Sequence, residues 1–286
     1  MHPDRPRLTD ARALAAHRAR ADLSAARFLH DEALLEIQER LKDVNRTFTY
    51  PALVTDFPTI WGELLQTGRI VPMAETLDLQ PAAHDLVIHA MSLHWSDDPV
   101  GQIVQCRRAL RPDGLFLGVA FGGATLTELR DALAQAETAV TGGLSPRVAP
   151  MAEIRDMGGL LQRAGLALPV ADALRKTVTY PNAIALMHDL RAMGETNALA
   201  ARHRAIPPRA LFPTMAAIYA RTHPAEENRI RSSFEFVFLS GWAPDDSQQK
   251  PLRPGAAKHR LADALGTTEF DETAKPVHER PDEERK

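Results

Sequence analysis

The chain has 286 residues, of which 44% are apolar and 25% are charged, and its formal net charge is −3. This length suits one large domain or a domain with an added lobe. The small net charge excludes a strong field toward nucleic acid or an anionic membrane. The single cysteine, Cys106, excludes an internal disulfide, fits a reducing compartment and lies in a helical pattern typical of a packed thiol.

The sequence also bears on location. No apolar run approaches the roughly 20 residues that span a bilayer. The first residues mix arginines with Asp4 and Asp10 and lack the apolar stretch of a secretory signal. The interspersed acids also disfavour a transit peptide, which is poor in acids. We therefore expect a cytoplasmic protein without a transmembrane segment.

The first half of the chain predicts helices followed by short strands. Residues 8–41 carry apolar side chains on one helical stripe, which predicts one or two amphipathic helices. Asp98 before Pro99 is typical of a helix start, because aspartate caps the first turn and proline fits into it. Short apolar runs predict three strands, at 52–54, 70–71 and 85–88.

The second half continues the alternation of strands and helices. Residues 115–121 predict a buried strand, and residues 125–128 have the pattern of a capping box that begins a helix. A further helix ends at Gly165, a residue type common just past helix ends. Residues 187–202 have a helical pattern, and residues 234–242 are rich in strand-forming side chains.

This order of elements predicts an α/β fold with a doubly wound sheet. We expect four segments in the chain. They are N-terminal helices over 1–48, a Rossmann-like core over 49–180, an extension over 181–265 that completes the sheet and the pocket, and a polar, disordered tail over 266–286.

Several motifs carry a resemblance to a known family. "DLVIHAMSLHWSDDP" and "RALRPDGLFLGVAFGG" resemble the fourth and fifth strands of class I S-adenosylmethionine-dependent methyltransferases. Four further motifs follow in order: "GGLSPRVAP", "DMGGLLQRAG", "YPNAIALMHDLRAMGETNA" and "SGWAPDDSQQKPLRPGAA". Together they resemble the methyltransferase-like complex I assembly factor family with its alphaproteobacterial relatives. More distantly, the chain is similar to the malonyl-acyl-carrier-protein O-methyltransferases of biotin synthesis.

The resemblance implies a Rossmann-like domain with S-adenosylmethionine at the carboxyl ends of its strands. It also implies a protein substrate or partner, such as a subunit of respiratory complex I, rather than a metabolite. The mitochondrial relative is thought to hydroxylate an arginine of a complex I subunit. The resemblance therefore implies two candidate activities, methyl transfer and arginine hydroxylation. The cofactor contacts that the resemblance implies fall on Asp56, Glu75, His89 and Met91.

The segment from 50 to 75 departs from the family's pattern. A methyltransferase of this class needs a glycine-rich turn after its first strand, where the backbone approaches the cofactor closely. Here no glycine follows that strand until Gly62, and Phe57, Pro58 and Trp61 bring bulk or remove an N–H. Asp56 could therefore cap the next helix instead of serving the cofactor.

The length of the same segment is a second departure. Only eight residues, "WGELLQTG", precede the run that matches the family's third strand. One helix fits there, but a second strand and helix do not, so we expect a shortened sheet without the acid that binds the cofactor's ribose. Glu75 is the remaining acid expected to face the adenine. We expect binding of S-adenosylmethionine to be lost.

Other candidate residues stand where a pocket opens in such sheets. His94 could act as a base, donate a hydrogen bond to a substrate, or bond a nearby loop. Arg147 could clamp a carboxylate of a substrate, or form a structural ion pair with Glu195 or Asp189. The remaining pocket candidates could equally be core, and they are Trp95, Glu195, Asn197 and Trp242. No His or Cys cluster has the spacing of a metal site.

Two functions fit these observations. The first is a non-catalytic accessory factor that uses the inherited fold to bind a protein partner in complex I assembly. The second is an enzyme that modifies a protein side chain, by methyl transfer or by arginine hydroxylation. Intact C-terminal motifs beside the altered cofactor segment favour the first. The set of His94, Trp95 and Arg147 at one pocket edge favours the second.

Overall fold

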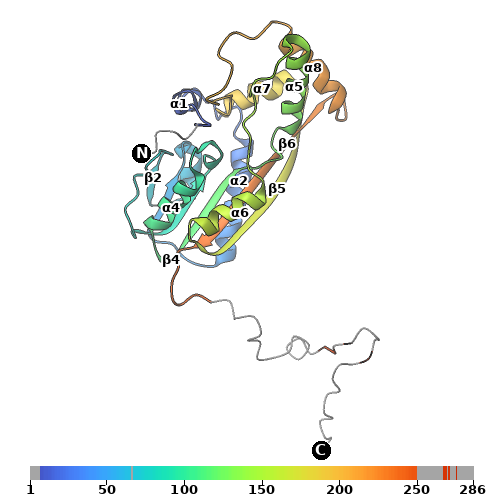
Figure 1. Ribbon diagram of the computed structural model, residues 1–286. Coiled ribbons are helices and arrows are strands. Elements are labelled where there is room, and N and C mark those ends of the chain that lie inside the picture. Colours follow the sequence, from blue (N-terminus) through green and yellow to red (C-terminus); the bar gives the residue numbers. More distant parts are fainter. Residues whose placement is uncertain (1–6, 66, 250–266, 269, 271–274, 276–286) are drawn as a thin grey trace, which may run out of the picture. The chain divides into compact units, whose positions relative to one another are not determined.

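The computed structural model describes residues 7–65, 67–249, 267, 268, 270 and 275. Contacts between residues group Met1–Asp246 into one unit and Ser247–Lys286 into another. All the helices and strands below belong to the first unit (Figure 1). Most of the tail predicted over 266–286 and about half of the polar run at 245–255 lie outside the described residues.

Six strands of the described chain form one sheet, as predicted for an α/β fold. Their order is β2-β1-β3-β4-β6-β5. The first four pair in parallel, whereas β6 runs antiparallel to both β4 and β5. Their bounds are β1 Pro51–Val54, β2 Arg69–Val71, β3 His84–Ala90, β4 Leu110–Phe121, β5 Ala167–Tyr180 and β6 Ile230–Trp242.

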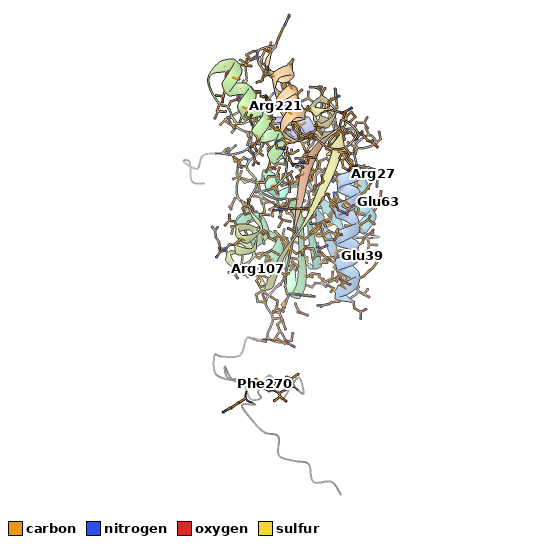
Figure 2. All side chains as sticks on the ribbon, turned by 90° about the vertical axis from the view of Figure 1, so that its right-hand side faces the viewer. Arg27, Glu39, Glu63, Arg107, Arg221 and Phe270 are labelled. Carbon is orange, nitrogen blue, oxygen red and sulfur yellow. The ribbon has the colours of Figure 1, made fainter. Side chains whose placement is uncertain are left out.

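Helices cover both faces of this sheet. Side chains alternate along a strand, so Leu53 packs into one apolar cluster and Val54 into the other. Figure 2 shows α2, marked by Arg27 and Glu39, on one side and α4, marked by Arg107, on the other. The first face meets α2 (Phe28–Val44), α3 (Pro58–Trp61), α5 (Thr127–Thr141), α7 (Ala183–Ala192) and α8 (Leu211–Thr222). The second meets α4 (Pro99–Ala109) and α6 (Ile154–Arg163).

Helices from outside the predicted core share this packing. Residues of α2, α7 and α8 and strand β6 join the cluster that holds β1, β3 and β4. The apolar core thus extends across the predicted segment boundaries at 48 and 180. The division of the chain at 48, 180 and 265 remains a prediction. Cys106 is buried on α4, and burial raises the pKa of its thiol, as expected of a packed, inert cysteine.

The shortened segment after β1 is confirmed. Between β1 and β3 lie only the four-residue α3, a 3-10 turn over Gly62–Leu64, and the three-residue β2. Strand β2 pairs directly with β1, and Ala52 faces Arg69. The 14 residues between Val54 and Arg69 hold α3 and the 3-10 turn and leave no room for another strand and helix, so the sheet ends at β2.

Two local predictions are wrong. The helix expected to reach residue 202 ends at Ala192, because Gly194 takes a φ of +76°. The expected capping box does not form, since no side chain caps α5. Thr125 Oγ1 donates instead to the carbonyl of Glu235, and Glu128 accepts from Ser233 N–H, so both side chains bind β6.

An N-terminal helix, α1 (Ala11–Arg18), contacts the carboxyl-end edge of the sheet through Arg18. Asp10 caps it by accepting from Ala13 N–H, and Asp10 N–H donates to the carbonyl of Ala198. No helix in the part of the chain that the structure describes is long and apolar enough to cross a membrane.

The approach of α1 to Gly194 predicts a stability difference between two glycines. A Cβ at Gly194 would lie 3.2 Å from Arg18 Cα at a positive φ, so Gly194→Ala should lower the free energy of unfolding by about 1–2 kcal/mol. In α6, a Cβ at Gly159 meets nothing within 4 Å, and Gly159→Ala should raise it by about 0.5–1 kcal/mol. Urea denaturation measures both, and equal effects would contradict the close approach.

Candidate functional site

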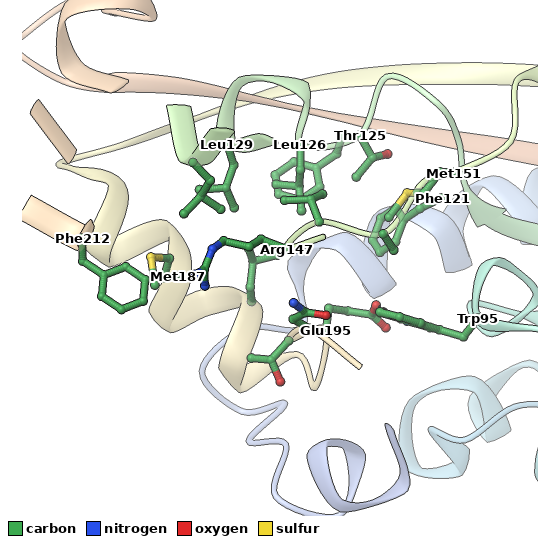
Figure 3. Close-up of a pocket in the computed structure, with 17 residues that line it drawn as sticks. Trp95, Phe121, Thr125, Leu126, Leu129, Arg147, Met151, Met187, Glu195 and Phe212 are labelled. Carbon is green, nitrogen blue, oxygen red and sulfur yellow. Dashed lines mark hydrogen bonds between the residues drawn. The ribbon is translucent and has the colours of Figure 1, made fainter. Parts of the chain in front are cut away.

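A cavity of about 230 Å³ opens beyond the carboxyl ends of β3 and β4 (Figure 3). Its wall is mostly apolar and comes from α5, α7, α8 and the loop before α6. Phe121 ends β4 and Trp95 follows β3, so these two rings tie the cavity to the edge of the sheet. Further apolar lining residues are Leu126, Leu129, Leu133, Val148, Met151, Met187, Leu190, Phe212 and Phe234.

Four of the residues singled out from the sequence line this cavity, namely Trp95, Arg147, Glu195 and Asn197. In Figure 3, Arg147 stands in the middle of the wall, with Trp95 and Glu195 toward one end and Phe212 and Met187 toward the other. Polar groups therefore meet a largely apolar space, which is the usual make-up of a small-ligand or side-chain site.

Glu195 is the buried charge of the cavity wall. Its Oε2 accepts from Trp95 Nε1 at 2.6 Å and lies 3.2 Å from His94 Nε2. Its Oε1 is paired with Arg18 across 3.7 Å. Burial would raise the pKa of Glu195, but the charge and hydrogen bond of His94, the charge of Arg18 and the Trp95 N–H outweigh it and hold the pKa at about 2.

His94 supports this carboxylate from behind the cavity wall. Its side chain is almost fully buried, and its ring packs 5.1 Å from that of Phe121. It is not among the cavity-lining residues. The structure therefore joins His94, Trp95 and Glu195 into one cluster, in which the histidine touches the carboxylate rather than the open space.

Arg147 forms an ion pair, with a partner that the sequence did not indicate. Its Nη2 donates to Glu137 Oε1 at 2.7 Å, and Ser145 Oγ donates to the same oxygen. Burial would raise the pKa of Glu137, but these hydrogen bonds from Arg147 and Ser145 hold it at about 2. The loop after α5 folds back on its own helix, so Glu195 and Asp189 are not the partners.

Asn197 fixes the same loop from the other side. Its Nδ2 donates to the carbonyl of Pro146 at 2.9 Å, and its Oδ1 accepts from Leu199 N–H. The loop over residues 145–149 is thereby held between α5 and the segment after α7, and Arg147 keeps its place in the wall.

The residues assigned to the cofactor lie outside the cavity, and the structure gives Asp56 a new role. Its Oδ2 forms an ion pair with Arg18, and its Oδ1 accepts from Met73 N–H at 3.0 Å. It does not cap α3, since Thr55 Oγ1 accepts from Phe57 N–H instead. Met91 is buried, and its carbonyl lies 3.4 Å from Arg18 Nη2.

Glu75 and His89 also lie outside the cavity. The Glu75 side chain is exposed, and its carbonyl accepts from Gln105 Nε2 of α4. His89 is fully buried on β3, 3.4 Å from Gln102 Oε1, and burial lowers its pKa to about 4. Gln102 also donates to the carbonyl of Ala74, so α4 holds the loop after β2 down on the strand ends.

These side chains, as they stand, do not fit S-adenosylmethionine at the strand ends. No glycine opens the turn after β1, and Phe57 and Trp61 are buried in the core. The guanidinium of Arg18 occupies the space between the ends of β1 and β3. None of Asp56, Glu75, His89 and Met91 lines the cavity that the structure does contain.

Trp242 does not line the pocket, contrary to one of the two interpretations given above, because it lies at the opposite end of the sheet. Its partner in the ladder is Leu115, near the beginning of β4, whereas the cavity lies beyond Phe121 at the end of that strand. The guanidinium of Arg46 stands 5.6 Å from its ring. Antiparallel β6 carries its last residue away from the carboxyl edge of the parallel strands.

Sequence reasoning missed Arg18. One indirect signal exists in the sequence, since a glycine at position 194 inside a helical pattern is typical of close packing or a ligand. In the structure the close neighbour of Gly194 is Arg18. Across the described ranges, no group of three or more His, Cys, Asp or Glu side chains could hold a metal ion.

Comparison with known proteins connects this geometry to a family. Residues 60–118 match a family described as "Methyltransferase domain". The chain is 41% identical to "Arginine-hydroxylase NDUFAF5, mitochondrial" of Dictyostelium discoideum over 65% of its own length and 43% of that protein. It is 35% identical to the human protein of that name, over 71% of this chain and 56% of that one. The chain is a homologue of the NDUFAF5 arginine-hydroxylases.

A more distant relative carries the name of a methyltransferase. The chain is 37% identical to "Malonyl-[acyl-carrier protein] O-methyltransferase" of Xylella fastidiosa over 60% of this chain and 56% of that protein. The chain spans about half the length of these curated relatives. Among solved structures, it is similar to the YcgJ protein of Bacillus subtilis with a TM-score of 0.44 and 10% identity, covering 70% of this chain and 94% of that one.

The relatives overturn one prediction. The NDUFAF5 proteins from Dictyostelium discoideum, mouse and human are all named mitochondrial, which contradicts the expectation of a cytoplasmic protein. That expectation used a single cysteine and the absence of an apolar span, and these features do not distinguish one reducing compartment from another.

Glu195 predicts a specific loss of stability in acid. A carboxyl whose folded pKa is lowered stabilises the protein above its ordinary pKa of 4.5, and this contribution is lost as the pH falls toward about 2. Glu195→Gln should cost about 3 kcal/mol at neutral pH by leaving Arg18 underpaired, and should flatten the stability profile between these values. Urea titrations across pH measure this. Glu75→Gln, at an exposed site, is the matched control and should leave the profile unchanged.

Proposed function

We propose that this chain is a methyltransferase-fold accessory factor that binds a side chain of a protein partner in the cavity at Glu195. The observation that carries the proposal is the cavity itself, whose apolar wall meets one buried carboxylate. The cavity lies beside the ends of β1 and β3, where the resemblance places the cofactor and where Arg18 and bulky side chains lie instead. The ancestral fold is thus kept and its open space lies to one side of the strand ends.

The cavity suits the side chain of an arginine. Its apolar wall can take the aliphatic stem, and Trp95 and Phe212 offer ring faces to a guanidinium. Glu195 Oε1 has Arg18 as its partner across 3.7 Å, so this oxygen keeps room for another donor. Glu137 neutralises Arg147, which would otherwise repel a cation. The relatives' name, arginine-hydroxylase, fits the same residue type.

The proposed partner is a protein rather than a metabolite. The motifs that resemble the complex I assembly factor family include the loop around Arg147 and the segment around Glu195, and both line the cavity. A subunit of respiratory complex I is therefore the partner class that we propose. S-adenosylmethionine has no part in this proposal, because the residues at the strand ends do not fit it.

An enzyme that modifies the bound side chain is the second candidate. The observation that favours it is the contact of His94 with Glu195, a titratable pair at the edge of the cavity. Under this alternative the cavity would hold the same arginine. The peptide would gain a methyl group from an added methyl donor such as S-adenosylmethionine, or one oxygen atom from dioxygen with an added two-electron reductant, the second oxygen atom leaving as water. Mass spectrometry of the peptide after incubation with each of these co-substrates separates the two candidates.

Titration of the full chain with a capped Gly-Arg-Gly peptide tests the binding proposal. Calorimetry should show a higher affinity for the arginine peptide than for the matched lysine or leucine peptides. Only arginine combines an aliphatic stem with a planar guanidinium that can stack on a ring and donate paired hydrogen bonds. Glu195→Gln should weaken binding by about tenfold or more, which corresponds to about 1.4 kcal/mol. Leu129→Trp, which fills the cavity, should abolish it.

The matched control is Trp242→Phe, at the far end of the sheet, which should bind the peptide as the parent does. Thermal unfolding of each variant separates lost binding from lost folding. Equal binding of leucine and arginine peptides, or full binding by a folded Leu129→Trp variant, would rule out the cavity as an arginine site.

A further inference from the structure

Arg18 closes the edge of the sheet where β1 and β3 end. It is the last residue of α1, and its side chain is only 5% exposed. It forms an ion pair with Asp56 in the turn after β1. Its guanidinium also lies 3.3 Å from Ser92 Oγ and 3.4 Å from the carbonyl of Met91, both in the turn after β3. One side chain from outside the sheet thus joins both turns.

The charges around Arg18 explain why it stays there. Burial lowers the pKa of this arginine, and Glu195 opposes the shift. A buried guanidinium is tolerated only when carboxylates and hydrogen-bond acceptors surround it, and here two carboxylates do. Without Arg18, Asp56 and Glu195 would face each other across a buried space with no cation between them.

The backbone holds Arg18 in place as well. Thr9 N–H donates to Asp97 Oδ1 at 2.9 Å, and Thr9 Oγ1 donates to the carbonyl of Trp95. At the other end of α1, Gly194 packs closely on the backbone, and a Cβ added to this glycine would lie 3.2 Å from Arg18 Cα. The helix is fastened to the strand ends and to the segment after α7, so it delivers the guanidinium from a fixed direction.

Arg18 also reaches the cavity through Glu195. One oxygen of this carboxylate faces Arg18, and the other holds the Trp95 N–H and the His94 ring. Trp95 and Glu195 line the cavity, whereas Arg18 does not. The arginine therefore acts on the cavity through the carboxylate that it pairs with.

We propose that Arg18 is an internal cation that closes the strand-end edge in place of S-adenosylmethionine and positions Glu195 in the cavity wall. The closure of the edge stands on the contacts of Arg18 alone. The positioning step rests on the proposed function, because it concerns the side-chain site.

Rescue by added guanidinium tests the closure. Arg18→Ala should lower the Tm of the full chain, and millimolar guanidinium chloride, far below denaturing levels, should recover part of the loss by occupying the empty place. Sodium chloride at the same ionic strength should not, and the parent protein should not respond. If guanidinium gives no more recovery than sodium chloride, Arg18 is not held as a cation and the proposal fails.

Titration of the parent protein with S-adenosylmethionine and S-adenosylhomocysteine is the second arm. We expect no heat and no rise in Tm at millimolar ligand. Micromolar binding by the parent would overturn the proposal, since the strand ends would then accept the cofactor with Arg18 in place. This arm holds even if Arg18→Ala does not fold, because it uses the unaltered chain.

Two further variants refine the result. Arg18→Ala with Asp56→Asn should melt above Arg18→Ala, because one stranded carboxylate is gone, and a lower or equal Tm would contradict the charge argument. Arg18→Ala should also lower the affinity for the arginine peptide by about tenfold, and added guanidinium should restore that affinity. Failure of the peptide arm alone removes the positioning step and the proposed function, and leaves the closure as measured by rescue and cofactor titration.

Discussion

The ion pairs of Arg18 with Asp56 and Glu195 join three parts of the chain that are far apart in sequence. Asp56 follows the first strand, Glu195 follows α7, and Arg18 ends the first helix. A buried cation and its two carboxylates cannot be separated without a large desolvation cost. The position of the N-terminal helix, the conformation at Gly194 and the placement of Trp95 in the cavity wall all depend on this one cluster.

The shortened first half of the sheet makes this cluster possible. With a single short strand beyond β1 and no glycine in the turn, the backbone leaves no close approach for a nucleotide ligand. The loop after β2 is instead held on α4 by Gln102 and Gln105. The cavity instead lies beside the strand ends, among α5, α7 and α8, where its apolar wall meets Glu195 and Arg147. Homology to methyltransferases and arginine-hydroxylases is thus compatible with a site that differs from the ancestral one in place and in chemistry.

Arg147, in the cavity wall, and Arg18, behind it, have different tasks. Arg147 and Glu137 fasten a loop to the end of α5, and their charges cancel beside the cavity. Arg18 faces two carboxylates at once, so its cluster retains an affinity for a further positive group, such as a guanidinium from a partner. A side chain that enters the cavity would therefore meet neutral walls and one end that favours a cation.

Local sequence patterns determined the elements and the ancestry. Strand-forming runs, the Asp98–Pro99 start of α4 and the glycines past helix ends act over a few residues, so the α/β order, the shortened sheet and the family could be predicted. The sequence also singled out Trp95, Arg147, Glu195 and Asn197 as pocket candidates, and the structure places all four in the wall of one cavity. Only the tertiary structure decided that Arg18 fills the strand ends, that Glu137 pairs with Arg147, and that Trp242 lies at the far end of β6. Those facts depend on which distant groups meet when the chain folds, and no pattern of spacing along the sequence records them.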